Sequence, residues 1–141
     1  MKLLNKLVST KPWMTDLALL GLRVFAGFSM LYVHGWGKWL RLNSGDEISF
    51  SDPYHLGATN SLILAVFAEL FCSLFLILGM FHRFAAFFLA FTMGTVVFVV
   101  KAGDSFGENE KAFLFLAIFV FLMLTGPGKL SLDQYMFNRK K

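Results

Sequence analysis

The sequence predicts an all-α protein, an integral membrane antiparallel four-helix bundle with both termini in the cytoplasm. The composition, the grouping of the apolar residues and the distribution of the cations predict this fold. Hydrophobic residues make up 57% of the 141 residues and charged residues 16%, whereas about 25% of the residues in an average soluble domain are charged. A chain of this length is expected to form a single domain, residues 1–141, and its mean hydropathy of +0.64 is too high for an ordinary water-soluble one.

The apolar residues form four blocks, and each block predicts one membrane span. A span needs about 17–25 predominantly apolar residues. Arg23 is the only charge over residues 17–33, and Glu69 is the only charge over residues 61–80. The last block is free of charge only over residues 112–125, so it must be extended at both ends to reach membrane length. The expected spans are residues 16–40, 60–80, 83–101 and 109–126.

The connections between the blocks carry turn signals. Thr15 and Asp16, which follow Pro12, predict the start of the first helix. The polar stretch NSGDEISFSDPY lies within residues 41–59 and predicts a loop on the outer surface. A Gly-Pro-Gly triplet ends the last span, and the Ser-x-x-Gln pattern after it predicts a short interfacial helix over residues 131–137.

Lysine and arginine residues are distributed unequally between the two sides of the predicted bundle. Eight lie on the side of the termini and four on the opposite side. Both termini are therefore expected in the cytoplasm, because cytoplasmic connections of membrane proteins are enriched in Lys and Arg. The net charge of +4 is attributed to orientation and anionic lipid rather than to nucleic acid. The eight are Lys2, Lys6, Lys11, Arg83, Lys129, Arg139, Lys140 and Lys141, and the four are Lys38, Arg41, Lys101 and Lys111.

Arg23 and Glu69 are informative because a charge at the centre of a bilayer costs about 2.5–3.5 kcal/mol on insertion scales. At 3.6 residues per turn, Arg23, His34 and Lys38 share one stripe of the first helix, and the depth of Glu69 falls between Arg23 and His34. We hypothesise that Arg23, His34 and Glu69 form a polar network inside the bundle, with Lys38 and Glu110 at its outer mouth. The alternative is a structural ion pair that fixes helix register, while Lys38 anchors its helix at the interface.

Other site chemistries have less support in the sequence. Cys72 is the only cysteine, so the chain can form neither an internal disulfide nor a Cys-x-x-Cys redox pair. His34, His55 and His82 are expected at different depths, whereas a bis-histidine haem needs two histidines at similar depth on facing helices. No cluster has the spacing of zinc ligands. Neither haem nor metal is therefore predicted, and a membrane quinone between the helices is the candidate cofactor.

Several landmarks follow one another over nearly the whole chain: Arg23 with Gly27, the motif HGWGK, the stretch AELFCSLFLILGMFHRFAA, Glu110, and the motif GPGKLSLD. In this order they resemble the DoxX family of small four-helix membrane proteins. The resemblance implies a four-helix bundle in the bacterial inner (plasma) membrane. Some members are similar to the small subunit of thiosulfate:quinone oxidoreductase, which implies redox chemistry that a partner protein or a quinone supplies.

Three functions are open at this stage, and whether the chain is itself an enzyme is open with them. In the first, the chain is the membrane subunit of a quinone-linked oxidoreductase, whose catalytic residues His34 and Glu69 handle protons while Arg23 keeps Glu69 ionised. In the second, it is a non-enzymatic accessory or assembly protein that docks a partner through its buried polar network. A small transporter is least favoured, because the four spans contain no inverted repeat. The expected partners are the lipid bilayer, redox proteins at the membrane and a second copy of the chain.

Overall fold

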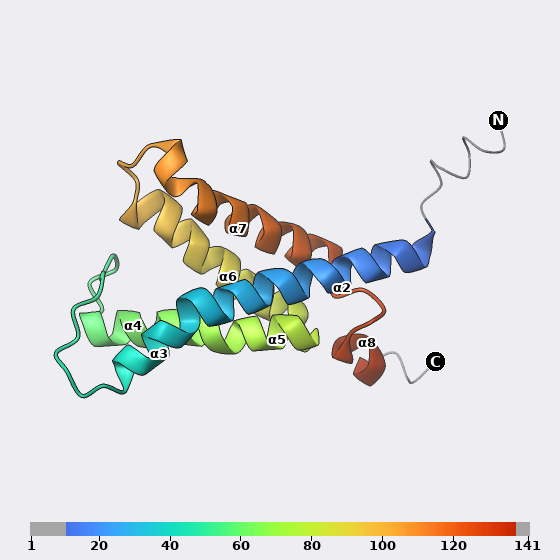
Figure 1. Ribbon diagram of the computed structural model, residues 1–141, viewed down its shortest axis with the longest axis horizontal. Helices are drawn as coiled ribbons and strands as arrows, with labels where there is room; N and C mark the ends of the chain where they lie inside the picture. Colours follow the sequence, from blue (N-terminus) through green and yellow to red (C-terminus); the bar gives the residue numbers. More distant parts are fainter. Residues whose placement is uncertain (1–10, 138–141) are drawn as a thin grey trace.

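The computed structural model describes residues 11–137, and within that part every regular element is a helix (Figure 1). The predicted all-helical class is therefore confirmed for the described residues. The first three long helices each contain a π-helical segment. The elements are α2 (Pro12–Ser29), η1 (Met30–Gly35) and α3 (Trp36–Leu42); α4 (Ala58–Val66), η2 (Phe67–Cys72) and α5 (Ser73–Leu78); α6 (His82–Thr95) and η3 (Val96–Val100); α7 (Phe106–Thr125); and α8 (Leu132–Phe137).

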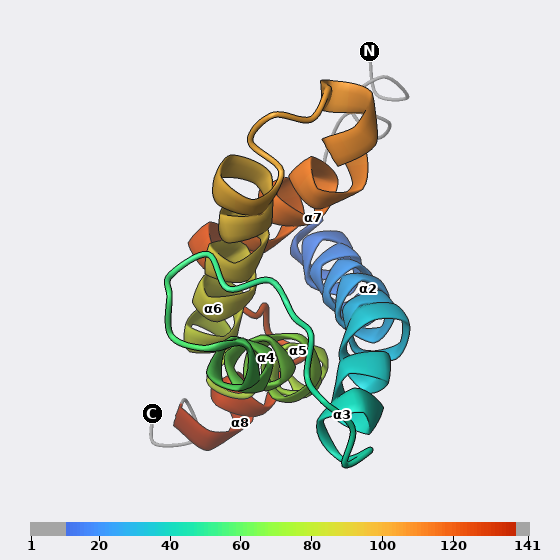
Figure 2. The ribbon, with the colours of Figure 1, turned by 90° about the vertical axis from the view of Figure 1, so that its left-hand side faces the viewer.

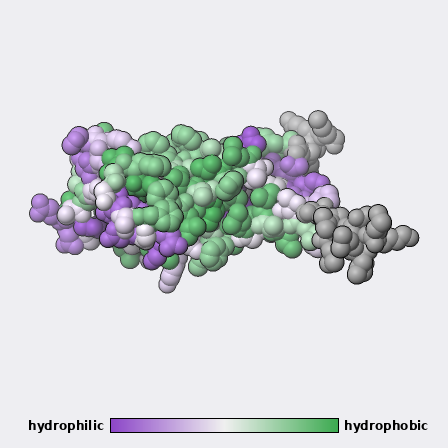
Figure 3. Space-filling view, turned by 90° about the horizontal axis from the view of Figure 1, so that it is seen from above, coloured by the Kyte–Doolittle hydropathy of each residue, from purple (hydrophilic) through white to green (hydrophobic). Residues whose placement is uncertain are grey.

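Three of these helices, Pro12–Leu42, Ala58–Leu78 and His82–Val100, are long and apolar enough to cross a membrane. The face of the molecule seen in Figure 3 carries an apolar belt across its middle, with polar residues toward both ends. Large apolar side chains point outward from this belt; Phe25 is 69% exposed and Phe121 is 62% exposed. Soluble monomers rarely expose such a continuous apolar surface, so the chain is a membrane protein whose described residues, 11–137, fold into helices.

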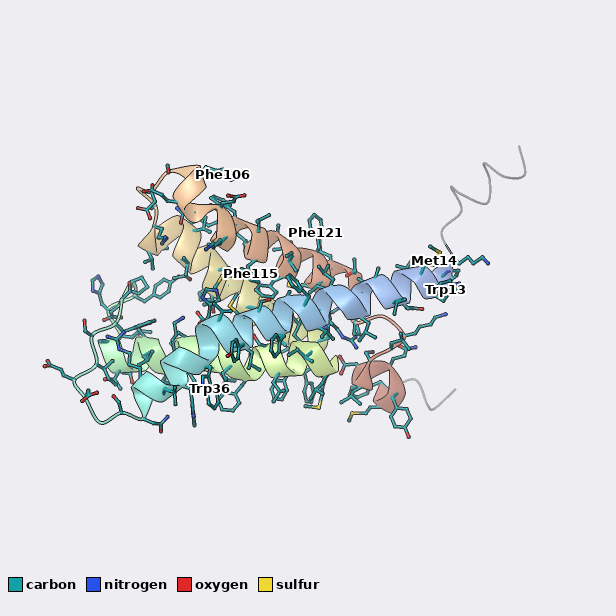
Figure 4. The ribbon with its side chains drawn as sticks, viewed as in Figure 1. Trp13, Met14, Trp36, Phe106, Phe115 and Phe121 are labelled. Atoms are coloured by element: carbon teal, nitrogen blue, oxygen red, sulfur yellow. The ribbon has the colours of Figure 1, made fainter. Side chains whose placement is uncertain are left out.

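Tryptophan side chains mark both ends of the first long helix. Trp13 and Trp36 are exposed and lie near opposite ends of the apolar belt (Figure 4). Tryptophan is enriched at membrane–water interfaces, where its ring contacts the apolar layer and its N–H reaches the polar one. Helix α7 is about as long as the helix His82–Val100. It carries the charged residues Glu108, Glu110 and Lys111 in its first two turns, so its apolar stretch is shorter than the helix.

Successive long helices run in alternating directions, so that the start of α2 and helix α8 lie at one end of the molecule (Figure 1). The connection from Asn43 to Gly57 and the turn before α7 lie at the other end. Small residues such as Ala26, Ala85 and Ala86 are fully buried and let the helices approach one another. Larger side chains fill the remaining core, among them Met30, Leu62, Leu76, Leu89, Phe119 and Leu122.

The first helix begins at Pro12, four residues before the expected start at Asp16. Proline is favoured in the first helical turn because its φ angle already suits a helix and its missing N–H leaves no donor unpaired there. Asp16 does not cap this helix; its Oδ1 accepts a hydrogen bond from the backbone N–H of Lys129 at 2.9 Å. The early start makes α2 extend beyond the neighbouring helices (Figure 1).

Of the cations used to predict orientation, Lys2, Lys6 and 139–141 lie outside the described residues.

The first two long helices cross closely where their π-helical segments meet. A Cβ atom at Gly35 would lie 2.6 Å from the carbonyl oxygen of Glu69, and one at Gly27 would lie 3.1 Å from the carbonyl oxygen of Ser73. Eight residues separate the two glycines, which in a regular α-helix would leave them about 80° apart around the axis. The wider turn of η1 takes up the excess and places both glycines against the second helix.

Replacing Gly35 with alanine is expected to destabilise the protein, because the new methyl group would press on the backbone of Glu69. Overpacking of this kind costs about 1–3 kcal/mol. Thermal unfolding in mild detergent would measure the loss. Gly37→Ala is the matched control, since nothing lies within 4 Å of a Cβ there and alanine favours the helix. Equal unfolding temperatures for the two variants would contradict the close crossing.

Candidate functional site

The buried carboxylate of Glu69 pairs with Lys38. Glu69 lies in η2 and is 3% exposed. Lys38 lies in α3 on the crossing helix, and its Nζ donates a hydrogen bond to Glu69 Oε2. A buried charge is costly unless it is paired, so the close crossing at Gly35 and this ion pair support each other. The structure thus joins two of the residues that the sequence singled out.

A cavity of about 340 Å³ lies beside this ion pair. Lys38 and Glu69 contribute charged groups to its wall, and Phe67, Phe88 and Phe91 contribute aromatic rings. The cavity lies between the second and third long helices and the 43–57 connection, which passes in front of α4 and α6 (Figure 2). An apolar cavity with a few polar groups in its wall is the usual form of a small-molecule site.

The 43–57 connection is held over the cavity by Asp52. Its carboxylate accepts hydrogen bonds from the backbone N–H groups of Leu56 and Gly57 at 2.9 and 2.8 Å, and from Ser61 Oγ at 2.7 Å. The bond from the Ser61 hydroxyl, followed by the bonds from the Gly57 and Leu56 N–H groups, lowers the pKa of Asp52. Because these donors lie around the start of α4, the ionised carboxylate fixes the loop to that helix.

Tyr54 and Thr95 form a second polar contact in the wall of the cavity. The Tyr54 hydroxyl lies 2.8 Å from Thr95 Oγ1, and both residues line the cavity. The Tyr54 ring stacks on Phe91, with 6.2 Å between ring centroids. The loop therefore closes one side of the cavity with an aromatic ring whose hydroxyl faces α6.

His34 and Glu110 are not among the residues that line the cavity. His34 lies in η1, and its ring meets the ring of Phe115 in α7 edge-on, with 6.0 Å between centroids. The charges of Glu69, Lys38 and Lys111 act on this ring. Glu110 is exposed near the start of α7. His34 thus lies behind the ion pair, between it and α7.

Arg23 does not contact Glu69, so the expected pairing of these two residues is wrong. Arg23 is 2% exposed, and its Nε donates to the carbonyl oxygen of Ile77 at 3.3 Å. Its two terminal nitrogens donate to the carbonyl oxygens of Pro127 and Leu130. The last carbonyl groups of a helix have no partner within that helix, and a guanidinium has five donors to offer them. The extension of α2 places Arg23 level with the end of α5 rather than beside Glu69.

Asp133 completes the same end of the molecule. Its carboxylate accepts hydrogen bonds from the backbone N–H groups of Phe81 and His82 at 2.8 and 2.9 Å, at the start of α6. Its own N–H donates to the carbonyl oxygen of Gly79 at 2.9 Å. The motifs around the α5–α6 turn and after α7 are therefore packed together, and their polar groups serve the structure.

Sequence reasoning missed Asp52, Tyr54, Thr95 and Asp133 as interacting residues. The loop stretch SDPY was seen only as a turn signal, although an Asp a few residues before a helix is a common cap. Asp133 had no such signal, because it lies within α8 and accepts from backbone N–H groups of Phe81 and His82 far away in the sequence. Nothing in the sequence indicates that Tyr54 contacts Thr95, since 41 residues separate them.

The fold and this site define the class of the molecule: a helical membrane protein with an ion pair in the wall of an apolar cavity. A family model described as DoxX matches residues 18–102, and the chain therefore belongs to the DoxX family. This confirms the resemblance seen in the sequence. The chain is 29% identical to an uncharacterized protein of Haemophilus influenzae (strain Rd) over 146 aligned residues, which cover 96% of this chain and 100% of that protein. No solved structure matches.

Replacing Arg23 with methionine is expected to destabilise the end of the molecule that holds α8. Three backbone carbonyl groups would lose a charged donor, and each hydrogen bond from a charged group contributes about 1.5–3 kcal/mol. Arg23→Lys should recover only part of the loss. The planar guanidinium of arginine reaches three chain segments at once, and the compact ammonium group of lysine cannot. The effect would be measured by thermal unfolding and by the rate of protease cleavage in the segment between α7 and α8. Arg83→Met, at an exposed arginine, is the control; equal loss in both variants would contradict this role.

Stability of the 43–57 loop is expected to depend on pH through Asp52. Because the pKa of Asp52 is lowered in the folded protein, its stabilising effect is complete above the ordinary carboxyl pKa of about 3.9 and is lost as the pH falls through the lower folded value. The protection factors of the Leu56 and Gly57 amides in hydrogen exchange should therefore be unchanged between about pH 5 and 8. Asp52→Asn should expose these amides at every pH, and Asp46→Asn in the same loop should not. Unchanged protection in Asp52→Asn would refute the assignment.

Proposed function

We propose that this protein is the membrane subunit of a quinone-linked redox complex of the bacterial inner membrane. The observation that carries the proposal is the Lys38–Glu69 ion pair in the wall of an apolar cavity of about 340 Å³. A quinone ring is flat and apolar apart from its carbonyl oxygens, and the cavity offers aromatic rings and a few polar groups. The family resemblance to a quinone-dependent oxidoreductase subunit points in the same direction.

Lys38 and Glu69 take the two complementary parts in this proposal. The Lys38 ammonium donates a hydrogen bond to one ring carbonyl oxygen. The Glu69 carboxylate accepts the hydroxyl proton of the reduced ring, and both groups act in a site of low dielectric constant where charge interactions are strong. His34, behind the pair and next to α7, passes this proton toward the outer surface near Lys111 and Glu110.

The proposed topology is the four-span antiparallel bundle with both termini in the cytoplasm. Helix α7 serves as the fourth span, with Glu108, Glu110 and Lys111 at the membrane edge. The excess of Lys and Arg on the side of the termini supports this orientation. The cavity then lies toward the outer face, and the two electrons that the ring gives up with its protons pass to a partner redox enzyme that this chain does not contain.

The second candidate is a non-enzymatic accessory or assembly protein. One observation favours it: the ion pair lies at the close helix crossing of Gly35 and Glu69, where it also fixes helix register. In that case the cavity holds lipid chains, and loss of the ion pair changes stability without changing the binding of any quinone.

Quinone binding to the protein in lipid nanodiscs tests the proposal. Lys38→Met and Glu69→Gln are expected to weaken the binding of a short-chain quinone about tenfold, since each removes a charged hydrogen-bond partner. Arg41→Gln is the matched control, because it removes an exposed cation from the same helix α3. Wild-type protein that binds no quinone, or equal affinities in all variants, would leave the accessory role as the better account.

A further inference from the structure

We propose that Tyr54 and Thr95 form a second oxygen site in the cavity, and that this site makes the protein bind the hydroquinone more tightly than the quinone. This inference rests on the proposed function and assigns a protein partner to the second ring oxygen of the ligand. A para-quinone carries two ring oxygens on opposite sides of the ring, and Lys38 and Glu69, which contact each other, can serve only one of them.

The direction of the Tyr54–Thr95 hydrogen bond follows from the other bond that Thr95 makes. Thr95 Oγ1 donates its single hydrogen to the carbonyl oxygen of Phe91 at 3.0 Å. It has no second hydrogen, so in its contact with Tyr54 at 2.8 Å the phenol must be the donor. The oxygen of the Tyr54 hydroxyl then keeps its lone pairs for another group.

Two other hydroxyl groups in the wall of the cavity, those of Ser61 and Thr92, already donate to partners of their own. Ser61 Oγ donates to Asp52, and Thr92 Oγ1 donates to the carbonyl oxygen of Phe88 at 2.9 Å. Tyr54 is held by its stack on Phe91, yet its O–H bond rotates about the ring axis without moving the ring. The Tyr54 hydroxyl can therefore serve a ligand oxygen in the cavity.

The two redox forms of the ligand make opposite demands on Tyr54. A hydroquinone hydroxyl donates, so Tyr54 accepts from it and keeps its own bond to Thr95, while Glu69 accepts from the other hydroxyl. A quinone carbonyl oxygen only accepts, so Tyr54 must turn its proton away from Thr95 to reach it. Binding the quinone therefore breaks a hydrogen bond that binding the hydroquinone leaves intact, which favours the reduced form.

The test measures the dissociation constants of a short-chain para-quinone and its hydroquinone, anaerobically, with the protein in nanodiscs. The wild type is expected to bind the hydroquinone about 3- to 10-fold more tightly, the value of one hydrogen bond. Tyr54→Phe keeps the ring stack and should weaken the hydroquinone by a similar factor. Thr95→Val should strengthen the quinone about 3- to 10-fold and leave the hydroquinone unchanged, because Tyr54 then has no bond to break.

Thr92→Val is the matched control. Thr92 lines the same cavity and bonds to its own helix in the same way, but its hydroxyl does not contact Tyr54 in the structure. Both affinities should stay at their wild-type values in this variant. Hydrogen exchange of the loop amides checks that Tyr54→Phe keeps the loop closed.

The outcomes separate this inference from the function on which it rests. If both forms bind and Lys38→Met weakens them, but Thr95→Val and Tyr54→Phe match the wild type, the second oxygen site is overturned and the quinone site stands. If the wild type binds neither form, both proposals fail. Stronger quinone binding in Thr95→Val, but not in Thr92→Val, supports the inference, because a loop that only covers the cavity gives no gain.

Discussion

The close crossing of η1 and η2 is the constraint on which the rest of the structure depends. Gly35 brings the backbone of the first helix against that of Glu69, and only at this separation can Lys38, one turn further on, reach the buried carboxylate. The π-helical turns make the contact compatible with a second glycine, Gly27, on the same face. Short π-helical segments within an α-helix occur frequently at functional sites. Here they set both the helix packing and the position of the charges.

The polar groups of the described residues divide between two ends with different chemistry. At the end that holds α8, Arg23 donates to backbone carbonyl groups and Asp133 accepts from backbone N–H groups, so their hydrogen-bonding capacity is used by the protein. At the other end, Lys38, Glu69 and Tyr54 retain capacity toward a cavity. A lysine ammonium has three donors, and one of them meets Glu69. The first end therefore stabilises the fold, and the second offers the polar groups that the proposed quinone would use.

The sequence predicted the elements better than the contacts between them. Long apolar blocks correctly gave the helices, because the bilayer and the backbone demand such lengths. A single buried Glu69 correctly implied a cationic partner. Glu69 was expected to join a network with Arg23 and His34, because a constant 3.6-residue period and the expected helix starts were used to place these residues. The π turn at Met30–Gly35 changes the period, and the extension of α2 from Pro12 changes the depth. The π turn leaves no clear signal in the sequence, Pro12 was taken only as a residue that precedes the helix, and the contact of Tyr54 with Thr95 depends on how a loop folds back.

The position of the ion pair bears on whether it is only structural. Replacing a buried ion pair by well-packed apolar side chains of similar volume is often neutral or stabilising, and Gly35 and Gly27 already fix the register by close backbone contact. A pair that served only register would be expected in a filled interior, where it can be fully surrounded. Glu69 and Lys38 instead line a cavity of about 340 Å³, whose wall forgoes the dispersion contacts of a packed core. The buried ion pair and the adjoining cavity each lower the stability of the fold, and both occur at the same place. This combination favours a site that is completed by a ligand.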